Sequence, residues 1–376
     1  MVINLDHAAS GFGYNPSSIH NGGRIARQRI EFAKRRIADV LGCDPDEIFF
    51  TSGGSESNNW AIKGVAFANQ DKGNHIITTQ IEHPSVLESC KYLEQHGFRV
   101  TYLPVDSSGY IKPEAFYNAV NRDTILVSIG TLNHEIGTWQ LLKPYQIYAK
   151  SQGALFHSDC VQAAANHLPS CRDALQSSDL VSISGHKFGA PKGVGILYIQ
   201  NGTKIDPLIH GGHQQSGLRA GTEPDHLILQ LATNLDGSFI DDQYALTELW
   251  RVRAMRDTLY NHIVNELPDT KLNGANLESR AACNLNLCFP GVDGEALTLA
   301  LSAIGIYVSR GSACSSGEYT PSPILKAIGL SDEDAMCSIR ITLHPNITQE
   351  EVEFAADRII ECVKQIRHMG EGASST

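Results

Sequence analysis

The sequence predicts an α/β fold, with a large domain built on a mostly parallel sheet of seven strands and a smaller α+β domain after it. From about residue 25 to residue 200, short runs rich in branched and aromatic residues alternate with amphipathic helical stretches. That alternation is typical of parallel strands joined by helices on both faces of the sheet. After about residue 240 the pattern changes to a long helical stretch with few strand-like runs, and 376 residues are enough for two domains.

The elements follow from this pattern in order. In the first part, the expected helices are 23–41, a stretch from residue 55, 85–96, 113–120 and 144–151. The expected strands there are 47–51, 74–79, 99–105, 124–131, 154–159, 179–184 and 195–199. In the second part, we expect helices over 245–267, 294–302 and 349–367, strands over 284–289 and 338–343, and a Ser/Gly/Pro-rich loop over 309–323.

The composition is that of an acidic globular chain. A net charge of −11 argues against direct binding of nucleic acid but permits a basic protein partner. Nine cysteines without a CxxC pair favour reduced thiols over a disulfide scaffold or a zinc site. The N-terminus lacks a signal-peptide pattern, and no apolar run reaches the roughly 18 residues of a transmembrane helix. We therefore expect a cytoplasmic protein with no membrane partner.

Ligands of parallel sheets bind beyond the carboxyl ends of the strands, so the residues after each predicted strand are the candidates. Residues 53–57 follow a strand and open a helix, which suits a phosphate, although a plain capped turn has the same pattern. His83 and residues 133–135 follow two more strands, and either could be an ordinary turn. Asp159 could bind a cationic ring nitrogen or cap a turn. Lys187 could be partly buried and suited to form a Schiff base, although most lysines are simply solvated.

Together these weak signals match the needs of pyridoxal phosphate. Its phosphate needs the start of a helix, and its ring nitrogen needs a carboxylate that keeps it protonated. Its aldehyde needs a lysine. The candidate residues supply all three in chain order.

The motifs around these residues resemble those of a known family. They are FTSGGSESNN, TTQIEHPSVL, NHEIGT, FHSDCVQ, SISGHKFGAPKGVG, GLRAGT and SRGSACSSG. They are similar to the motifs of class V pyridoxal-phosphate enzymes of the cysteine desulfurase type, and they extend from Leu5 to about Arg340. The resemblance implies PLP fold type I, with a large domain over 15–245 and a small domain made of 1–14 and 246–376. It also implies a homodimer.

The resemblance implies a role for each candidate. Lys187 would hold the cofactor aldehyde, Asp159 the pyridine nitrogen, and His83 would stack on the ring. The residues expected to contact the ring oxygen or the phosphate are Gly54, Ser55, His134, Gln162, Ser184, His186 and, from the other subunit, Thr222.

The substrate side follows from the same resemblance. Arg340 would bind the carboxylate of L-cysteine, because a guanidinium can grip a carboxylate with two hydrogen bonds. Asn15 and His20 resemble a segment near the mouth of the active site.

Cys314 is the residue that distinguishes the cysteine desulfurase type from other class V enzymes. It lies in a small, polar run, whereas a structural cysteine such as Cys288 has apolar neighbours. A loop cysteine can act as a thiolate nucleophile, although an inert surface cysteine would show the same pattern. We expect Cys314 to accept sulfur from the substrate as a persulfide, leaving L-alanine, and to pass it to an acceptor protein. Lys187 would remove the Cα proton, and His83 would assist protonation of the product.

Two features depart from the family pattern. The interval between Asp6 and Asn15 is short, and His134 replaces a second Asn, which would make its contact with the ring oxygen sensitive to pH. Both features suggest a specialised desulfurase, serving DNA phosphorothioation or tRNA thiolation rather than general iron–sulfur assembly. The alternatives are a selenocysteine lyase or aminotransferase of the same fold, or a non-catalytic partner in sulfur relay.

Overall fold

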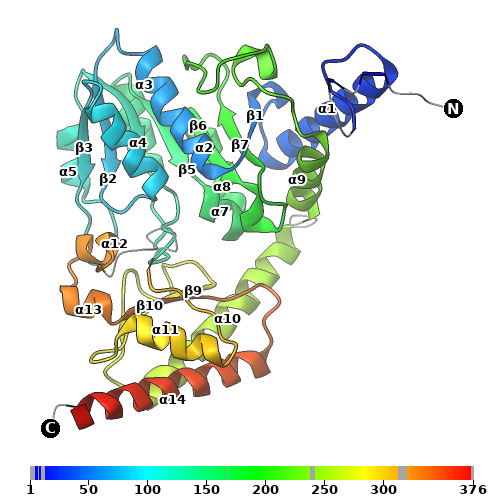
Figure 1. Cartoon of the computed structure of the whole chain (residues 1–376). Helices are drawn as coiled ribbons and strands as arrows, with labels where there is room; N and C mark the ends of the chain where they lie inside the picture. The colour runs from blue at the N-terminus through cyan, green and yellow to red at the C-terminus, as the bar shows by residue number, and fades with distance from the viewer. Residues whose placement is uncertain are drawn as a thin grey trace.

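The structure is a computed structural model that describes residues 5–6, 8–9, 13–166, 168–237, 242–311 and 320–373. It contains a seven-stranded sheet and a separate three-stranded sheet. Helix α1 at the N-terminal end and helix α14 at the C-terminal end lie at opposite ends of the molecule (Figure 1). Every helix in the described ranges is too short or too polar to cross a bilayer.

The large sheet has the strand order β1-β7-β6-β5-β4-β2-β3. Neighbouring strands from β6 to β3 run parallel, and β7 runs antiparallel to both β6 and β1. The predicted mostly parallel sheet of seven strands is therefore confirmed. Its strands are β1 (Ile48–Thr51), β2 (His75–Thr79), β3 (Arg99–Leu103), β4 (Thr124–Ser128), β5 (Leu155–Asp159), β6 (Leu180–Ser184) and β7 (Gly195–Ile199).

Helices cover both faces of this sheet. Successive residues of its strands point to opposite faces, and the apolar residues on each face are buried against helices. Ile76 and Leu197, for example, join a core beneath α4, whereas their neighbours Ile77 and Ile196 join cores on the other face. The helices of the large domain are α1 (Asn21–Leu41), α2 (Gly54–Asn59), α3 (Val65–Ala68), α4 (Pro84–Glu94), α5 (Pro113–Ala119), α6 (Lys143–Ser151), α7 (Val161–Asn166), α8 (Leu168–Ser177) and α9 (Asp225–Gly237).

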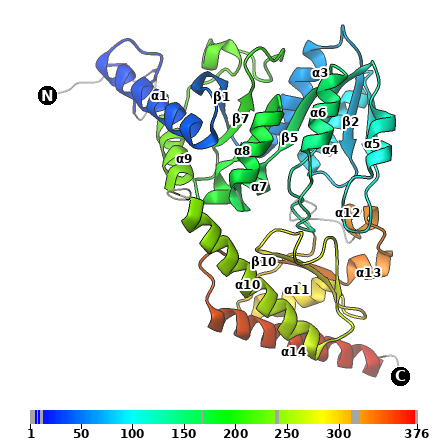
Figure 2. The same cartoon turned by 180° about the vertical axis from the view of Figure 1, so that it is seen from behind.

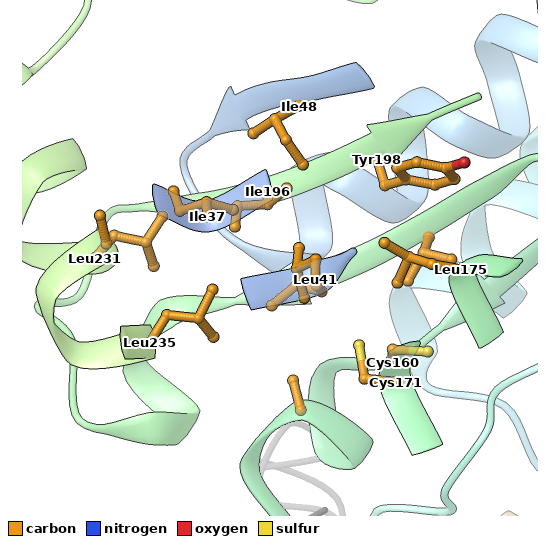
Figure 3. Close-up of a cluster of buried hydrophobic side chains, with 14 of the residues drawn as sticks. Ile37, Leu41, Ile48, Cys160, Cys171, Leu175, Ile196, Tyr198, Leu231 and Leu235 are labelled. Carbon is orange, nitrogen blue, oxygen red and sulfur yellow. The ribbon is translucent and has the colours of Figure 1, made fainter. Parts of the chain in front are cut away.

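Helix α9 was not expected from the sequence, and it packs along α1. Figure 3 shows Ile37 and Leu41 of α1 beside Leu231 and Leu235 of α9, all against Ile196 of the sheet. Helices α7 and α8 also fall where no helix was predicted. The three helices close one face of the core behind β6 and β7.

The small sheet is antiparallel, with the order β10-β9-β8. Every second residue of β9 and β10 is apolar and belongs to one core with residues of α10, α11 and α14. Figure 2 shows these three helices beside the small sheet. The elements of this part are α10 (Asp242–Glu266), β8 (Lys271–Leu272), β9 (Asn284–Cys288), α11 (Gly294–Ala303), α12 (Pro323–Ala327), α13 (Asp332–Met336), β10 (Ser338–Thr342) and α14 (Gln349–Ala373).

The expected domain boundary at residue 245 falls inside α10, which runs from the end of the large domain into the small one. Residues 1–14 were expected with the small domain. Instead, Asp6 accepts a hydrogen bond from Ser18 Oγ at 2.9 Å and lies 3.1 Å from His20 Nε2, at the start of α1. The described part of this segment therefore lies against the large domain.

Candidate active site

One cavity of about 230 Å³ lies at the carboxyl ends of the parallel strands. Its wall contains residues that follow β1, β2, β4, β5 and β6, together with one residue from the small sheet. The predicted site residues that line it are Gly54, Ser55, His83, His134, Asp159, Gln162, Ser184, His186, Lys187 and Arg340. A larger cavity of about 850 Å³, between α6, α8 and α10, is lined by none of them.

The start of α2 forms one end of the cavity and is built from small residues. A Cβ on Gly54 would lie 2.6 Å from Val161 Cγ2 and 3.5 Å from Ser184 Cβ, so the backbone here packs as closely as a glycine allows. Ser184 Oγ lies 2.9 Å from His186 Nδ1. Helix-start N–H groups, two serine hydroxyls and a histidine make a cradle that fits a phosphate.

Asp159 ends β5 with both carboxylate oxygens accepting hydrogen bonds. Val161 N donates to Oδ1 at 2.9 Å, and Asn58 Nδ2 donates to Oδ2 at 2.7 Å. These bonds hold the carboxylate in one orientation in the cavity wall, where it can face a cationic ring nitrogen. Asn58 was not predicted as a site residue, although it lies in the quoted run SESNN.

His83 and His134 lie next to each other in the cavity wall. Their rings are edge to face, with centroids 5.2 Å apart. Burial lowers the pKa of His83, with Asp159 opposing the shift and Lys187 adding to it. Both rings are therefore neutral near pH 7.

His134 has a buried ring nitrogen, Nε2, with no hydrogen-bond partner among the described residues. Burial, followed by the positive charges around it, lowers the pKa of His134 to about 3. The expected pH sensitivity of this residue is therefore wrong near neutral pH. An unsatisfied buried nitrogen in the wall suits a polar ligand atom, such as the ring oxygen of pyridoxal phosphate.

Arg340 reaches the cavity from the small sheet. The alternation of β9 and β10 places Asn284, Asn286 and Arg340 on the face opposite the apolar core. Arg340 Nη1 donates to the carbonyl oxygen of His134 at 2.9 Å, and both asparagines donate to the carbonyl oxygen of Glu135. The polar face of the small sheet is thus fixed to the loop that follows β4.

Lys187 lies in the 3₁₀ turn Gly185–Phe188, directly after β6. Its charge contributes to the lowered pKa of His83, His134 and His186, after the larger effect of burial. In the single chain its side chain is exposed, which differs from the expected partial burial.

Glu82 is a second wall residue that the sequence analysis missed. Its carboxyl accepts from Thr79 Oγ1 at 2.7 Å and from Gly130 N at 2.9 Å. Burial, with a further contribution from Asp159, raises the pKa of Glu82 to about 8. The sequence signal was its place beside His83 in the run IEHPS.

Three predicted residues do not line the cavity. Asn15 donates to Ala9 O at 3.2 Å, and His20 accepts from Gly23 N as the N-cap of α1. Thr222 is exposed in the loop before α9. Cys314 lies outside the described residues.

The chemistry of the wall fits pyridoxal phosphate. It combines a lysine, a fixed carboxylate, an imidazole with an unsatisfied nitrogen and a small-residue cradle at a helix start.

Comparison with known proteins agrees with this geometry. The family profile described as aminotransferase class-V matches residues 6–354. The chain belongs to this family. A relative named cysteine desulfurase IscS, from Methanosarcina thermophila, is 45% identical over 97% of this chain and 88% of its own length.

Solved structures of family members superpose on most of the chain. A NifS-like protein has a TM-score of 0.84 at 36% identity, covering 95% of this chain and 93% of its own. SspA in complex with cysteine has a TM-score of 0.74 at 34% identity, covering 91% of this chain and 94% of its own. The predicted resemblance to class V enzymes of the cysteine desulfurase type is confirmed.

Proposed function

We propose that the protein is a pyridoxal-phosphate-dependent cysteine desulfurase, which converts L-cysteine to L-alanine and receives the sulfur on Cys314. The observation that carries this proposal is the single cavity that combines Lys187, Asp159, His83 and Arg340. Relatives named cysteine desulfurase, and a structural neighbour described in complex with cysteine, support the choice of substrate.

Different residues of the chain would bind different parts of the cofactor. Lys187 would supply the amine for its aldehyde, and Asp159 would face its ring nitrogen. His134 and Gln162 would contact the ring oxygen. Gly54, Ser55, Ser184 and His186 would hold the phosphate. When bound, pyridoxal phosphate withdraws electrons from the α-carbon of the amino acid.

The remaining steps belong to the protein. Arg340 binds the substrate carboxylate, and Lys187 takes the Cα proton. The Cys314 thiolate attacks the substrate sulfur as the Cβ–S bond breaks, so that the sulfur leaves as a persulfide on Cys314. His83 assists the return of a proton to the carbon that lost sulfur, and L-alanine is released.

Seven of the other eight cysteines support the choice of Cys314. Burial raises the pKa of Cys43, Cys90 and Cys288 to about 12 and of Cys283 to about 11, and it also raises the pKa of Cys337 and Cys362. A hydrogen bond that the Cys171 thiol donates to Cys160, together with burial, raises the pKa of Cys171. Thiols with raised pKa values are poor nucleophiles at neutral pH.

The partners follow from the same proposal. Thr222, exposed in the single chain, would reach the phosphate of a second copy, which makes a homodimer part of the proposal. The persulfide passes to an acceptor protein in the cytoplasm, without direct contact with nucleic acid. Its final destination is DNA phosphorothioation, tRNA thiolation or iron–sulfur assembly.

The test compares cofactor-loaded wild type, Cys314→Ala and the control Cys362→Ala, each incubated with L-cysteine. We expect wild type and the control to release alanine and to gain one sulfur atom, detected by mass spectrometry of the intact protein. Cys314→Ala should do neither at the native rate. Alanine release by Cys314→Ala at the native rate would contradict the nucleophile assignment.

The same samples test the rest of the proposal. Borohydride reduction should fix the cofactor to the peptide that contains Lys187. A wild type that consumes selenocysteine or a keto acid but not cysteine would favour the rival lyase or transaminase.

A further inference from the structure

Asn58 connects two of the groups in the cavity wall. It lies in α2 and is 1% exposed. Its Nδ2 donates to Asp159 Oδ2 at 2.7 Å and to Ser85 Oγ at 2.9 Å. A carboxylate can only accept hydrogen bonds, so the amide nitrogen must be the atom that faces Asp159.

The amide cannot turn over without losing these bonds. Its Oδ1 is buried and has no hydrogen-bond partner in the described ranges. Rotation of the amide would place that oxygen against the Asp159 carboxylate, and two acceptors repel each other. The orientation of Asn58 is therefore fixed by Asp159.

Ser85 links Asn58 to His83 through hydrogen bonds. Because Ser85 Oγ accepts from Asn58, its own hydrogen is available for His83 Nδ1, which is 2.8 Å away. Ser85 N, which can only donate, also points to His83 Nδ1 at 3.2 Å. His83 Nδ1 is thus an acceptor of two hydrogen bonds, and in a neutral imidazole the proton must then be on Nε2.

We propose that Asn58 is a positioning residue that acts through Ser85 to fix the neutral, Nε2-protonated tautomer of His83 while it holds one oxygen of Asp159. One amide, that of Asn58, would then fix both the Asp159 carboxylate that is to face the ring nitrogen and the His83 imidazole that is to stack on the ring. This inference rests on the proposed function for its catalytic meaning, because His83 serves there as a group that holds a proton.

Several charged or titratable groups face His83 from neighbouring elements. They are Asp159 on β5, Lys187 after β6 and His134 after β4. Glu82 precedes His83 in the chain and is held by Thr79 and Gly130. Ser85→Ala leaves all four groups in place, whereas a substitution at Asn58 also removes a hydrogen bond from Asp159. Comparison of the two variants therefore separates the hydrogen-bonded chain from the change at Asp159.

The test is histidine ¹⁵N NMR on the full-length, cofactor-free protein, with the His83 signal assigned by its absence in His83→Gln. In wild type, we expect the shift of an acceptor nitrogen at Nδ1 and of a protonated nitrogen at Nε2. Ser85→Ala, which leaves the Ser85 N–H as the donor to Nδ1, should increase the population of the other tautomer and raise the pKa of His83 by roughly half a unit or more, as expected for loss of one hydrogen bond. Asn58→Leu, which frees the Ser85 hydroxyl to turn, should shift both in the same direction by a smaller amount.

The matched controls are Asn59→Leu and Ser89→Ala. Asn59 bonds to Ser55 O and Lys63, and Ser89 donates to Ser85 O, so neither side chain touches His83. Both should leave the His83 signals unchanged. If Asn58→Leu does not fold, Ser85→Ala, which removes one oxygen atom, gives the same readout.

The outcomes separate the inference from the proposed function. A wild type with the proton on Nδ1, or variants with an unchanged tautomer and pKa in a protein that desulfurates cysteine, would overturn the role of Asn58 alone. The expected shifts in a cofactor-loaded protein that never desulfurates cysteine would instead overturn the proposed function.

Discussion

Arg340 Nη1 donates to the carbonyl oxygen of His134 at 2.9 Å. This bond joins β10 of the small sheet to the loop that follows β4 of the large one. A cation from one sheet is therefore held in the wall of a cavity whose other groups come from the second sheet.

Replacement of Arg340 by lysine should weaken substrate binding more than turnover. Lysine keeps the charge but cannot make two parallel hydrogen bonds to a carboxylate, which a guanidinium can. We expect KM for L-cysteine to rise by roughly 10- to 100-fold, as for loss of one charge-assisted hydrogen bond. Steady-state alanine production checks this, with Arg367→Lys, whose side chain bonds to Asp269 and Pro290 O, as the control. An unchanged KM would show that the carboxylate binds elsewhere.

Substitution of Gly54 by alanine should disturb the phosphate cradle through a single contact. The new Cβ would lie 2.6 Å from Val161 Cγ2, closer than carbon atoms approach, so the Val161 side chain or the start of α2 would have to shift. Such overpacking costs about 1–3 kcal/mol, and if the cost falls on the bound form it lowers pyridoxal phosphate affinity by roughly 5- to 150-fold. Absorbance titration of the cofactor-free protein measures it. Val161→Ala in the same chain should restore much of the affinity, and failure to do so would mean that the clash is not the cause.

The parallel strands explain why much of this site could be predicted. Their carboxyl ends share one edge of the sheet, so His83, His134, Asp159 and Lys187 had to lie near one another once the strands were recognised. The chemistry of each residue type then suggested its role.

Contacts between distant segments explain what could not be predicted from the pattern. Asn58 and Asp159 are 101 residues apart, and their hydrogen bond depends on how α2 packs on β6 and β7, next to β5. Arg340 comes from the other sheet, and only the family resemblance placed it at the site. Helix α9 is recognisable through its packing on α1, which is a tertiary contact that a local pattern does not carry.

Buried His157 should make the protein less stable in acid. Its ring nitrogens lie 2.8 Å from Ser128 Oγ and 2.9 Å from Ser182 Oγ, and burial lowers the pKa of His157 to about 3. The unfolded chain binds the proton near pH 6.5, so stability falls as the pH drops from 6.5 towards 3. The loss from this residue at pH 5 is about 2 kcal/mol.

Urea unfolding of the cofactor-free protein at pH 7.5 and pH 5 checks this effect of pH. His157→Gln cannot titrate, so its free energy of unfolding should change less between the two pH values than that of wild type. The exposed control His226→Gln should follow wild type. If the free energy of unfolding changes equally between pH 7.5 and pH 5 in wild type and in His157→Gln, His157 is not the titrating group.

Glu82 should change the stability of the protein with pH in the opposite direction to His157. Its folded-state pKa of about 8 lies above the usual 4.5, so the folded protein keeps a proton that the unfolded chain releases. Its stabilising effect is therefore complete below pH 4.5 and is lost as the pH rises to about 8. Glu82→Gln stays neutral, and its amide can still donate to Thr79 Oγ1 while its oxygen accepts from Gly130 N.

The free energy of unfolding of Glu82→Gln, relative to wild type, should therefore increase from pH 5.5 to pH 8, by an amount on the order of 1–3 kcal/mol. Urea unfolding at the two pH values measures the difference, with the exposed Glu88→Gln as the control. If the free energies of unfolding of Glu82→Gln and wild type change equally from pH 5.5 to pH 8, Glu82 is ionised in the folded protein at neutral pH. Glu82 and Asp159 would then place two negative charges in the wall of the same cavity.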